Sequence, residues 1–338
     1  MAAGFGALLG RFERQGMLVL GDMVADEYQI GRPSRISREA PVLILHHAQS
    51  FVRPGGATNT ANNLSALSAR TSVIGVIGDD AMGRRLRDAL DEAGICTDGL
   101  LIDSGRPTST KTRILAKGTQ EVQQQIVRID RVDDRVIEGT LRDRMIDAIR
   151  RALPDNDALL VSDYENGVIS QEVIDACLPE ARRRGLTVTV DSHGDLFRFQ
   201  DITAATPNQP EAEATLHRNI ENDEQLAAAG AELLEGMNSQ GVLITRGSEG
   251  VVLFERDRPA YRLPISMGAE AEVVDPTGAG DTVAAVFTLA LAAGAEMRSA
   301  AFLGNLAGGE VVRKLGAATL RRDELLQALE RTHLQPPA

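Results

Sequence analysis

The stretch that decides the fold is Asp275-Pro276-Thr277-Gly278-Ala279-Gly280-Asp281. It follows the apolar pair Val273-Val274 and leads directly into an apolar, alanine-rich helix pattern at 282–291. Small residues at a strand-to-helix turn let backbone N–H groups converge on one point, and the helix start adds positive potential there. Asp281 beside that point could take a proton from an attacking hydroxyl group. A simpler interpretation is that Asp281 caps the helix and the glycines only make the turn.

Composition indicates a globular protein and narrows its partners. The 338 residues are 43% hydrophobic and 25% charged, and the length allows one large domain or two. The net charge of −12 argues against nucleic acid and anionic membranes, which both need a basic surface. Cys96 and Cys177 are far apart, which argues against a disulfide scaffold or zinc site and fits the cytoplasm. No apolar run approaches the roughly 20 residues of a membrane helix, and residues 5–14 suggest an amphipathic helix instead of a signal peptide.

Short β-branched runs alternate with helical patterns along most of the chain. Strands are expected at 17–20, 72–77, 159–161, 188–190 and 242–244, and helices at 58–69, 81–93, 141–153, 171–184 and 224–235. This alternation predicts an α/β fold with a mainly parallel sheet and helices on both faces. Because polar residues follow the strands, we expect them to meet in one crevice at the carboxyl ends.

Two regions, 28–52 and 108–130, show strand patterns without intervening helices. We therefore expect a small antiparallel sheet inserted into a single domain that covers residues 1–338. A sheet inserted near strand ends is a good candidate for a lid over the site.

Two further segments could bind a sugar. Gly55-Gly56 precede a helix pattern, and Asn59 on it could both donate to and accept from a sugar hydroxyl. Taken alone, this segment is more typical of a plain helix start. Asp22 follows the first strand, and its carboxylate could bind vicinal hydroxyls or cap a turn.

A third group of segments could bind a nucleotide. Asn208 and Glu211 stand one helical turn apart, so both could face a ligand, with Glu211 holding Mg²⁺ through water. Alone, the pair is better explained as a capping box. The segment 245–250 links two strand patterns, and Thr245 and Gly247 could line a phosphate or belong to an ordinary hairpin.

These segments occur together in an order that resembles one enzyme family. Gly55-Gly56 before a helix, Pro207-Asn208 with Glu211, and the seven residues 275–281 are similar to signatures of the PfkB (ribokinase-like) carbohydrate kinase family. The resemblance extends from about residue 17 to about residue 318. It implies a ribokinase-like fold and ATP-dependent phosphorylation of a sugar hydroxyl.

The resemblance also implies roles for individual residues. Asp281 would be the general base, and the transferred phosphoryl group would be bound by the amides of Gly278, Ala279 and Gly280. The residues expected to bind the sugar are Asp22, Gly55, Gly56, Asn59 and Asp163. Those expected at ATP are Asn208, Thr245, Gly247, Gly250 and Asn305. Glu211 would hold Mg²⁺ through water, and Asp275 with the Thr277 carbonyl would form a site for a monovalent cation such as K⁺.

A narrower resemblance concerns the acceptor. Segments 35–42, 110–113 and 162–164 are similar to kinases that phosphorylate D-glycero-D-manno-heptose 7-phosphate at its anomeric hydroxyl. Lys111, Arg113 and Arg128 on the lid strands would then bind the sugar phosphate, or they are ordinary solvated charges. Arg38 stands where a proline is usual and Asn166 where a lysine is usual, which leaves the acceptor open.

The alternatives are therefore a kinase of the same family for ribose, fructose or a nucleoside, and a non-catalytic sugar or nucleotide sensor. Heptose kinases often carry a fused nucleotidyltransferase domain, which these 338 residues do not include. The family also implies a homodimer formed through the lid.

Overall fold

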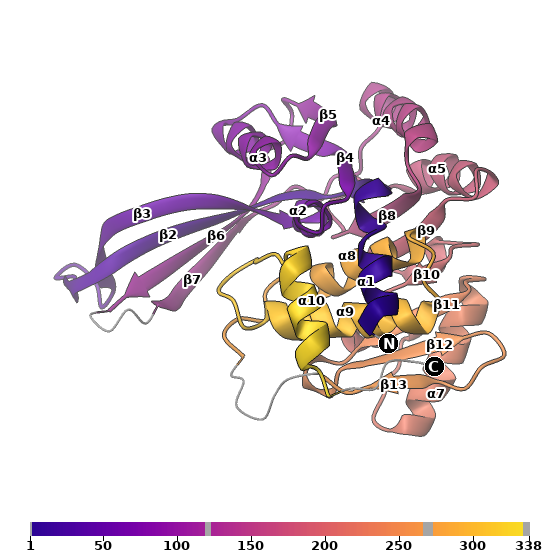
Figure 1. Cartoon of the computed structure of the whole chain (residues 1–338). Helices are drawn as coiled ribbons and strands as arrows, with labels where there is room; N and C mark the ends of the chain where they lie inside the picture. The colour runs from indigo at the N-terminus through magenta and orange to yellow at the C-terminus, as the bar shows by residue number, and fades with distance from the viewer. Residues whose placement is uncertain (1, 119–122, 266–272, 334–338) are drawn as a thin grey trace.

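The structure is a computed structural model that describes residues 2–118, 123–265 and 273–333. Its body is a nine-stranded sheet with the order β13-β12-β11-β10-β9-β8-β1-β4-β5 (Figure 1). The seven strands from β11 to β5 are parallel, and β12 and β13 add an antiparallel edge. Their bounds are β1 (Gly16–Gly21), β4 (Arg70–Gly78), β5 (Cys96–Asp103), β8 (Ala158–Asp163), β9 (Thr187–Ser192), β10 (Ala204–Ala205), β11 (Gly241–Thr245), β12 (Val251–Glu255) and β13 (Tyr261–Leu263).

Helices cover both faces of this sheet, as predicted. On β1, Met17 and Val19 belong to one buried apolar cluster, and Leu18 and Leu20 belong to the other. The helices of the first cluster are α1 (Ala2–Leu9), α2 (Ala57–Ala66), α3 (Ala81–Glu92), α8 (Ala279–Ala292), α9 (Met297–Val311) and α10 (Arg322–Arg331). Those of the second are α4 (Gly139–Ala152), α5 (Gln171–Arg183), α6 (Gln209–Leu216) and α7 (Asp223–Gly236). Burial on both faces explains why the central strands are continuous apolar runs.

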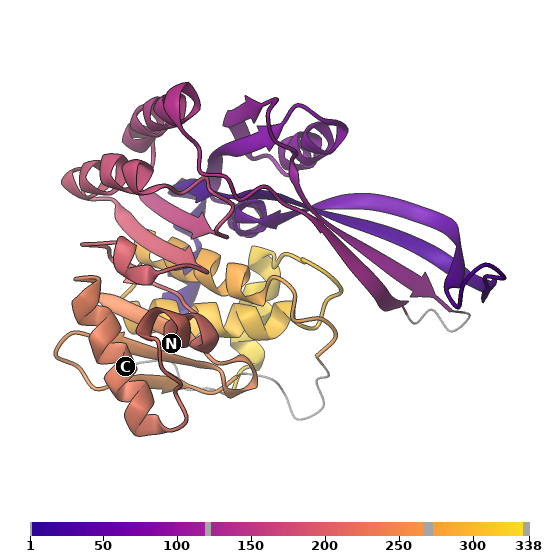
Figure 2. The same ribbon diagram turned by 180° about the vertical axis from the view of Figure 1, so that it is seen from behind.

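Four strands form a second, smaller sheet that projects from the body as a long curved ribbon (Figures 1 and 2). In the order β3-β2-β6-β7, they are β3 (Leu43–Gly56), β2 (Met23–Ile36), β6 (Ser109–Lys117) and β7 (Gln123–Arg131). The predicted separate sheet is confirmed with one difference. Its outer pairs are antiparallel, but β2 and β6 are parallel because both strands leave the body and run outwards. We call this sheet the lid.

Within the part of the chain that the structure describes, no helix is both long enough and apolar enough to span a bilayer. Several large apolar side chains of the lid are exposed, among them Ile36 at 59% and Ile129 at 56%. Such side chains on a projecting sheet are a feature of surfaces that bind another protein.

Candidate active site

Asp281 lies in the first turn of α8, where three separate parts of the chain meet. Its side chain is buried, with 6% exposed. Asn59 of α2 donates from Nδ2 to Oδ2 at 2.6 Å, and the hydroxyl of Tyr164, directly after β8, donates to Oδ1 at 2.7 Å. The Gly-Gly helix and the 275–281 turn therefore meet at one carboxylate.

The surroundings of Asp281 bring its pKa to a value suited to a general base. Burial raises the pKa to about 6, and the hydrogen bonds from Asn59 and Tyr164 oppose that rise. Asp26 raises the pKa further, whereas Lys111 lowers it. A carboxylate with a pKa near 6 is largely ionised at neutral pH and accepts a proton more readily than an exposed aspartate does.

The turn before α8 leaves backbone N–H groups free to bind an anion. Gly278 has a φ of 79°, which lets the chain turn into the helix without strain. Of the three amides predicted for the anion hole, that of Ala279 donates to the Pro276 carbonyl at 3.2 Å. Those of Gly278 and Gly280, and also that of Asp281, meet no acceptor among the described residues. Free amides at a helix start favour a phosphoryl group.

Asp275 holds the loop that carries these glycines. Its Oδ1 accepts the N–H of Thr277, and its Oδ2 accepts the N–H of Gly316 on the segment after α9, each at 2.9 Å. The Thr277 carbonyl accepts no hydrogen bond from the described residues. A carboxylate and an open carbonyl are ligands that a hard cation prefers, so these residues fit the predicted monovalent-cation site.

Asp22 and Asp163, both predicted to bind the sugar, hold the turn that follows β8. Asp22 Oδ2 accepts the backbone N–H of Tyr164 at 2.7 Å and of Asn166 at 3.2 Å. Asp163 accepts the N–H of Glu165 at 3.0 Å through Oδ1 and the Ser192 hydroxyl at 2.9 Å through Oδ2. Burial, and then the charge of Asp163, raise the pKa of Asp22 to about 6. The strand ends thus meet as predicted, and these contacts position Tyr164.

Gly55 and Gly56 bring the end of β3 close to β2. A β-carbon on Gly55 would stand 2.7 Å from Cγ of Asp26, and Gly56 caps α2 with a φ of 54°. Both positions therefore require glycine to place Asn59 against Asp281.

The three basic residues predicted on the lid have different surroundings. Arg113 forms a buried ion pair with Asp26 at 2.7 Å, so its charge balances a carboxylate of the protein. Arg128, its neighbour across β6 and β7, is half exposed and pairs with Asp130 at 2.9 Å. Lys111 places Nζ 4.9 Å from the ring centre of Tyr164. Among the three, Lys111 is the one that lies over Tyr164, and its charge lowers the pKa of the candidate base.

On the nucleotide side, Asn208 and Glu211 form the capping box of α6. Asn208 Oδ1 accepts the N–H of Glu211 at 2.9 Å, and Glu211 Oε2 accepts the N–H of Asn208 at 2.7 Å. A bridge between Asn208 and Thr245 brings these two residues together, and Gly247 and Gly250 follow with φ of 53° and 83°. Burial raises the pKa of Glu211 to about 7.

Asn305 lies on α9. Its Nδ2 donates at 2.8 Å to the carbonyl of Pro264, the residue that directly follows β13. Among the described residues, no three His, Cys, Asp or Glu side chains group closely enough to hold a metal alone. Glu211 therefore fits Mg²⁺ only in the way predicted, through water and phosphate oxygens.

The sequence did not assign a role to two groups at the site. The Tyr164 hydroxyl reaches Asp281, and the signal for it was an aromatic residue directly after the strand-end pair Ser162-Asp163. Arg53, two residues before Gly55, donates to the Leu315 carbonyl at 2.8 Å and lies 5.7 Å from the Tyr28 ring centre. No pattern in the sequence indicates that contact.

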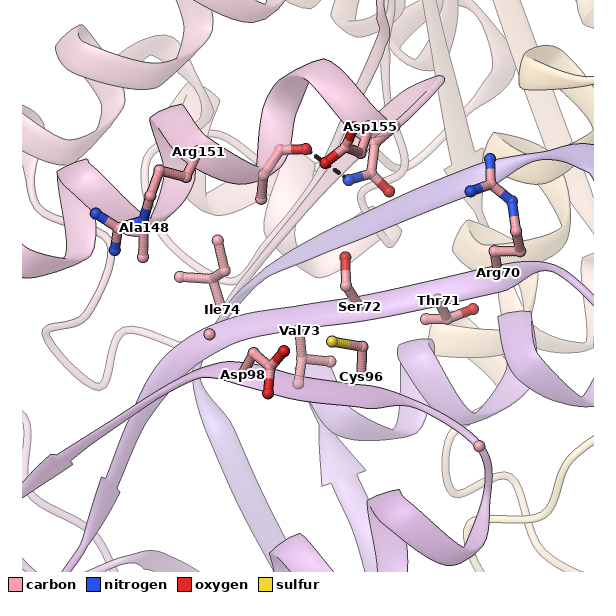
Figure 3. A pocket seen from close by; sticks show the side chains of 14 residues that line it. Arg70, Thr71, Ser72, Val73, Ile74, Cys96, Asp98, Ala148, Arg151 and Asp155 are labelled. Atoms are coloured by element: carbon pink, nitrogen blue, oxygen red, sulfur yellow. Dashed lines mark hydrogen bonds between the residues drawn. The ribbon is translucent and has the colours of Figure 1, made fainter.

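A separate cavity of about 610 Å³ lies between α4 and the amino-terminal halves of β4 and β5 (Figure 3). Arg70, Ser72, Cys96 and Arg151 are among the residues that line it. It is at the opposite end of these strands from the polar strand ends, and it contains none of the predicted site residues.

The sequence matches the pfkB family carbohydrate kinase description over residues 17–323. It is 38% identical over 328 residues to the bifunctional protein HldE of Pelobacter propionicus, covering 97% of this chain and 66% of that protein. For the bifunctional protein HldE of Citrifermentans bemidjiense, the identity is 41%, covering 91% of this chain and 62% of that protein. The chain therefore spans somewhat less than two thirds of the length of these relatives.

Solved structures with the same fold are more distant in sequence. The ribokinase of Arabidopsis thaliana, complexed with ribose and ATP, has a TM-score of 0.71 at 21% identity, with 94% of this chain and 99% of that chain covered. Phosphofructokinase-2 of Escherichia coli, in complex with potassium, has a TM-score of 0.73 at 17% identity, with 94% and 98% covered. These likenesses establish the ribokinase-like fold.

Proposed function

Since this chain belongs to the pfkB family of carbohydrate kinases, and is thus a sugar kinase, we propose that its acceptor is D-glycero-D-manno-heptose 7-phosphate. The γ-phosphoryl group of ATP is transferred to the anomeric hydroxyl, and the product is the 1,7-bisphosphate. The proposal rests on the resemblance of segments 35–42, 110–113 and 162–164 to heptose 7-phosphate kinases.

Asp281 accepts the proton of the attacking hydroxyl in this proposal. Two neutral donors, Asn59 and Tyr164, hold its carboxylate at 2.6 and 2.7 Å, and its pKa near 6 keeps it ionised at neutral pH. This is the observation that carries the proposed chemistry. The sugar binds between Asn59 and the lid. There its hydroxyls can hydrogen-bond with the groups that donate to Asp281, which are Asn59 and Tyr164.

The open amides of Gly278, Gly280 and Asp281 stabilise the charge of the transferred phosphoryl group, and the start of α8 adds its dipole. Asn208, Thr245, Gly247, Gly250 and Asn305 bind ATP. Glu211 would hold Mg²⁺ through water, and the ion would supply positive charge at the phosphates when bound. Asp275 and the Thr277 carbonyl would hold K⁺, which would add to the order that the hydrogen bonds of Asp275 give this loop. Because phosphoryl transfer needs little covalent work from the protein, positioning and charge account for most of the rate.

Lys111 and Arg128 bind the 7-phosphate from the lid, while Gly55, Gly56, Asp22 and Asp163 shape the sugar site around Asn59. Arg113 contributes indirectly, since it neutralises Asp26 beside that site. The sequence suggested the same role for all three basic residues, whereas this proposal assigns phosphate binding to Lys111 and Arg128 alone.

An acceptor panel tests the proposal. ADP release is measured with ATP and Mg²⁺ for heptose 7-phosphate, fructose 6-phosphate, fructose, ribose and a nucleoside. We expect kcat/KM to be highest for heptose 7-phosphate. A preference for an unphosphorylated sugar would reject the heptose assignment, and the same panel with Asp281→Asn should show no turnover.

We also propose that the enzyme is cytoplasmic and forms a homodimer through the lid. Exposed apolar side chains on β2, β3 and β7, namely Ile36, Leu43, Ile126, Val127 and Ile129, would be covered by a second copy. Sedimentation of the wild type and of an Ile36→Glu/Ile129→Glu variant tests this. The wild type should sediment as a dimer and the variant as a monomer, and a monomeric wild type would reject the dimer.

A further inference from the structure

Tyr164 makes the shortest approach of any hydroxyl to Asp281 among the described residues, at 2.7 Å. Thr60 is the other hydroxyl near the carboxylate, and its Oγ1 is 3.5 Å from the same Oδ1 atom. A distance of 2.7 Å is typical of a strong hydrogen bond to a charged acceptor, whereas 3.5 Å contributes little.

The phenol of Tyr164 is fixed from several sides. Its backbone N–H donates to Asp22, and its ring packs against His193 with centres 4.3 Å apart. Lys111 lies over the ring with Nζ 4.9 Å from the centre. Burial and the charge of Asp281 hold the pKa of Tyr164 well above its usual range, so the hydroxyl keeps its proton. The phenol can therefore serve Asp281 only as a donor.

The groups around Asp281 make such a donor necessary. The charge of Asp26 of β2 raises the pKa of Asp281, and that of Lys111 of β6 lowers it. The charge of Asp281 in turn raises the pKa of Asp191 of β9 and of Glu211 of α6. Asn59 and Thr60 of α2 supply the remaining polar contacts. Burial and the charge of Asp26 thus favour the protonated form of Asp281, and a hydrogen-bond donor opposes them.

We propose that Tyr164 is a positioning residue for the base: its hydroxyl fixes the orientation of the Asp281 carboxylate and keeps it ionised at neutral pH. The proposal rests on the role of Asp281 in the proposed function. It concerns the free enzyme, because an arriving sugar hydroxyl can take the place of the phenol.

The test is the Tyr164→Phe variant, which keeps the ring and removes the donor. The pH dependence of kcat/KM for heptose 7-phosphate reports ionisations of the free enzyme. We expect its acid limb to move to higher pH by about one unit, since one hydrogen bond to a charged group is lost. At about pH 8 Asp281 is ionised in both proteins, so the kcat/KM that the variant still lacks there reports the lost orientation of the carboxylate. Tyr261→Phe is the matched control, because Tyr261 lies on β13 beside Arg298 and should leave the limb unchanged.

A second measurement does not depend on the acceptor. The free energy of unfolding is determined in urea from pH 5 to 8 for the wild type, Tyr164→Phe, Asp281→Asn and the double variant. Because the folded pKa of Asp281 is raised, its stabilising contribution is lost as pH rises, and in Tyr164→Phe this loss should continue to higher pH. With Asp281→Asn as the background, the difference should be independent of pH.

An acid limb and a stability profile that both coincide with those of the wild type would overturn the proposal. If the wild type does not phosphorylate heptose 7-phosphate, the substrate assignment fails, and the stability profiles still decide the role of Tyr164.

Discussion

Gly278 lies directly against Asn59: a β-carbon on Gly278 would stand 2.5 Å from Nδ2 of Asn59. That same Nδ2 atom donates to Asp281 at 2.6 Å. The turn before α8 and the start of α2 can therefore pack together only because position 278 has no side chain. This packing lets the Asn59 amide donate to the candidate base.

Gly278→Ala should lower kcat/KM, whereas its effect on the free energy of unfolding should match that of a control glycine variant. Because the end of a short side chain moves more easily than backbone, we expect Asn59 to shift and its bond to Asp281 to break. The result should be a drop in kcat/KM of about tenfold at pH 7, from loss of one charge-assisted hydrogen bond. Steady-state kinetics and urea unfolding measure the two effects.

Gly94→Ala is the matched control for this variant. Gly94 has a φ of 73°, close to that of Gly278, but a β-carbon there would meet nothing within 4 Å. Both variants should lose about 1 kcal/mol of stability through the positive φ. Equal activity in the two variants would contradict the role given to Asn59.

Asp22→Asn should flatten part of the pH dependence of stability. The folded pKa of Asp22 is about 6, above its ordinary 3.8, so its stabilising contribution is complete below pH 4 and is lost as pH rises through 6. The shift corresponds to about 3 kcal/mol. The asparagine carbonyl can still accept from the N–H of Tyr164 and of Asn166, but the side chain cannot ionise.

Unfolding in urea at several pH values from 4 to 7 provides the measurement, and Asp88→Asn on the exposed face of α3 serves as the control. The Asp22→Asn profile should decline less than that of the wild type, and the control profile should match the wild type. Parallel profiles for Asp22→Asn and the wild type would show that the carboxylate does not titrate in this range.

The sequence was sufficient to predict the strands and helices of the large sheet. Strands buried in a parallel sheet appear in the sequence as apolar runs that end at polar residues. The two shortest strands have too few residues for a periodic pattern: β10, between β9 and β11, has two, and β13, at the edge of the sheet, has three. The parallel pairing of β2 with β6 was also beyond the sequence, since hairpin signals describe only neighbours in the chain.

For the site, the motif residues Asp281 and Asn59 could be predicted because their spacing to glycines carries the signal. The sequence could not predict that Arg113 would pair with Asp26 instead of facing a ligand. Strand register decides which side chains meet across a sheet. Asp191 was expected among the polar strand ends, but its burial was not predicted, for a related reason. Its burial at the end of β9 depends on α8 packing there, which no local pattern records.

Arg53→Met should slow catalysis by loosening the loop before α8. Arg53 donates to the Leu315 carbonyl, and the next residue, Gly316, donates to Asp275, which holds that loop. Methionine keeps the apolar stem but not the hydrogen bond. We expect kcat to fall about tenfold, because small displacements of catalytic groups are costly.

Combining Arg53→Met with Asp275→Asn tests the connection. If lid and loop communicate through Gly316, the double variant should lose less than the product of the two single effects. Arg32→Met, on the exposed outer part of β2, controls for the loss of a lid charge. Independent effects of the two variants would mean that Arg53 acts elsewhere.

Lys111→Met should weaken binding of the sugar phosphate without weakening binding of ATP. Lys111 lies over Tyr164 beside the base, whereas Arg128 is half exposed and already pairs with Asp130. We expect the KM for heptose 7-phosphate to rise about tenfold in Lys111→Met, from loss of one charged contact, with the KM for ATP unchanged. Arg128→Met is the comparison and should show a smaller rise, and the reverse order would assign the phosphate to Arg128.

Arg113→Met cannot serve here, because leaving Asp26 buried without its partner should cost about 3–5 kcal/mol of stability and obscure any effect on binding.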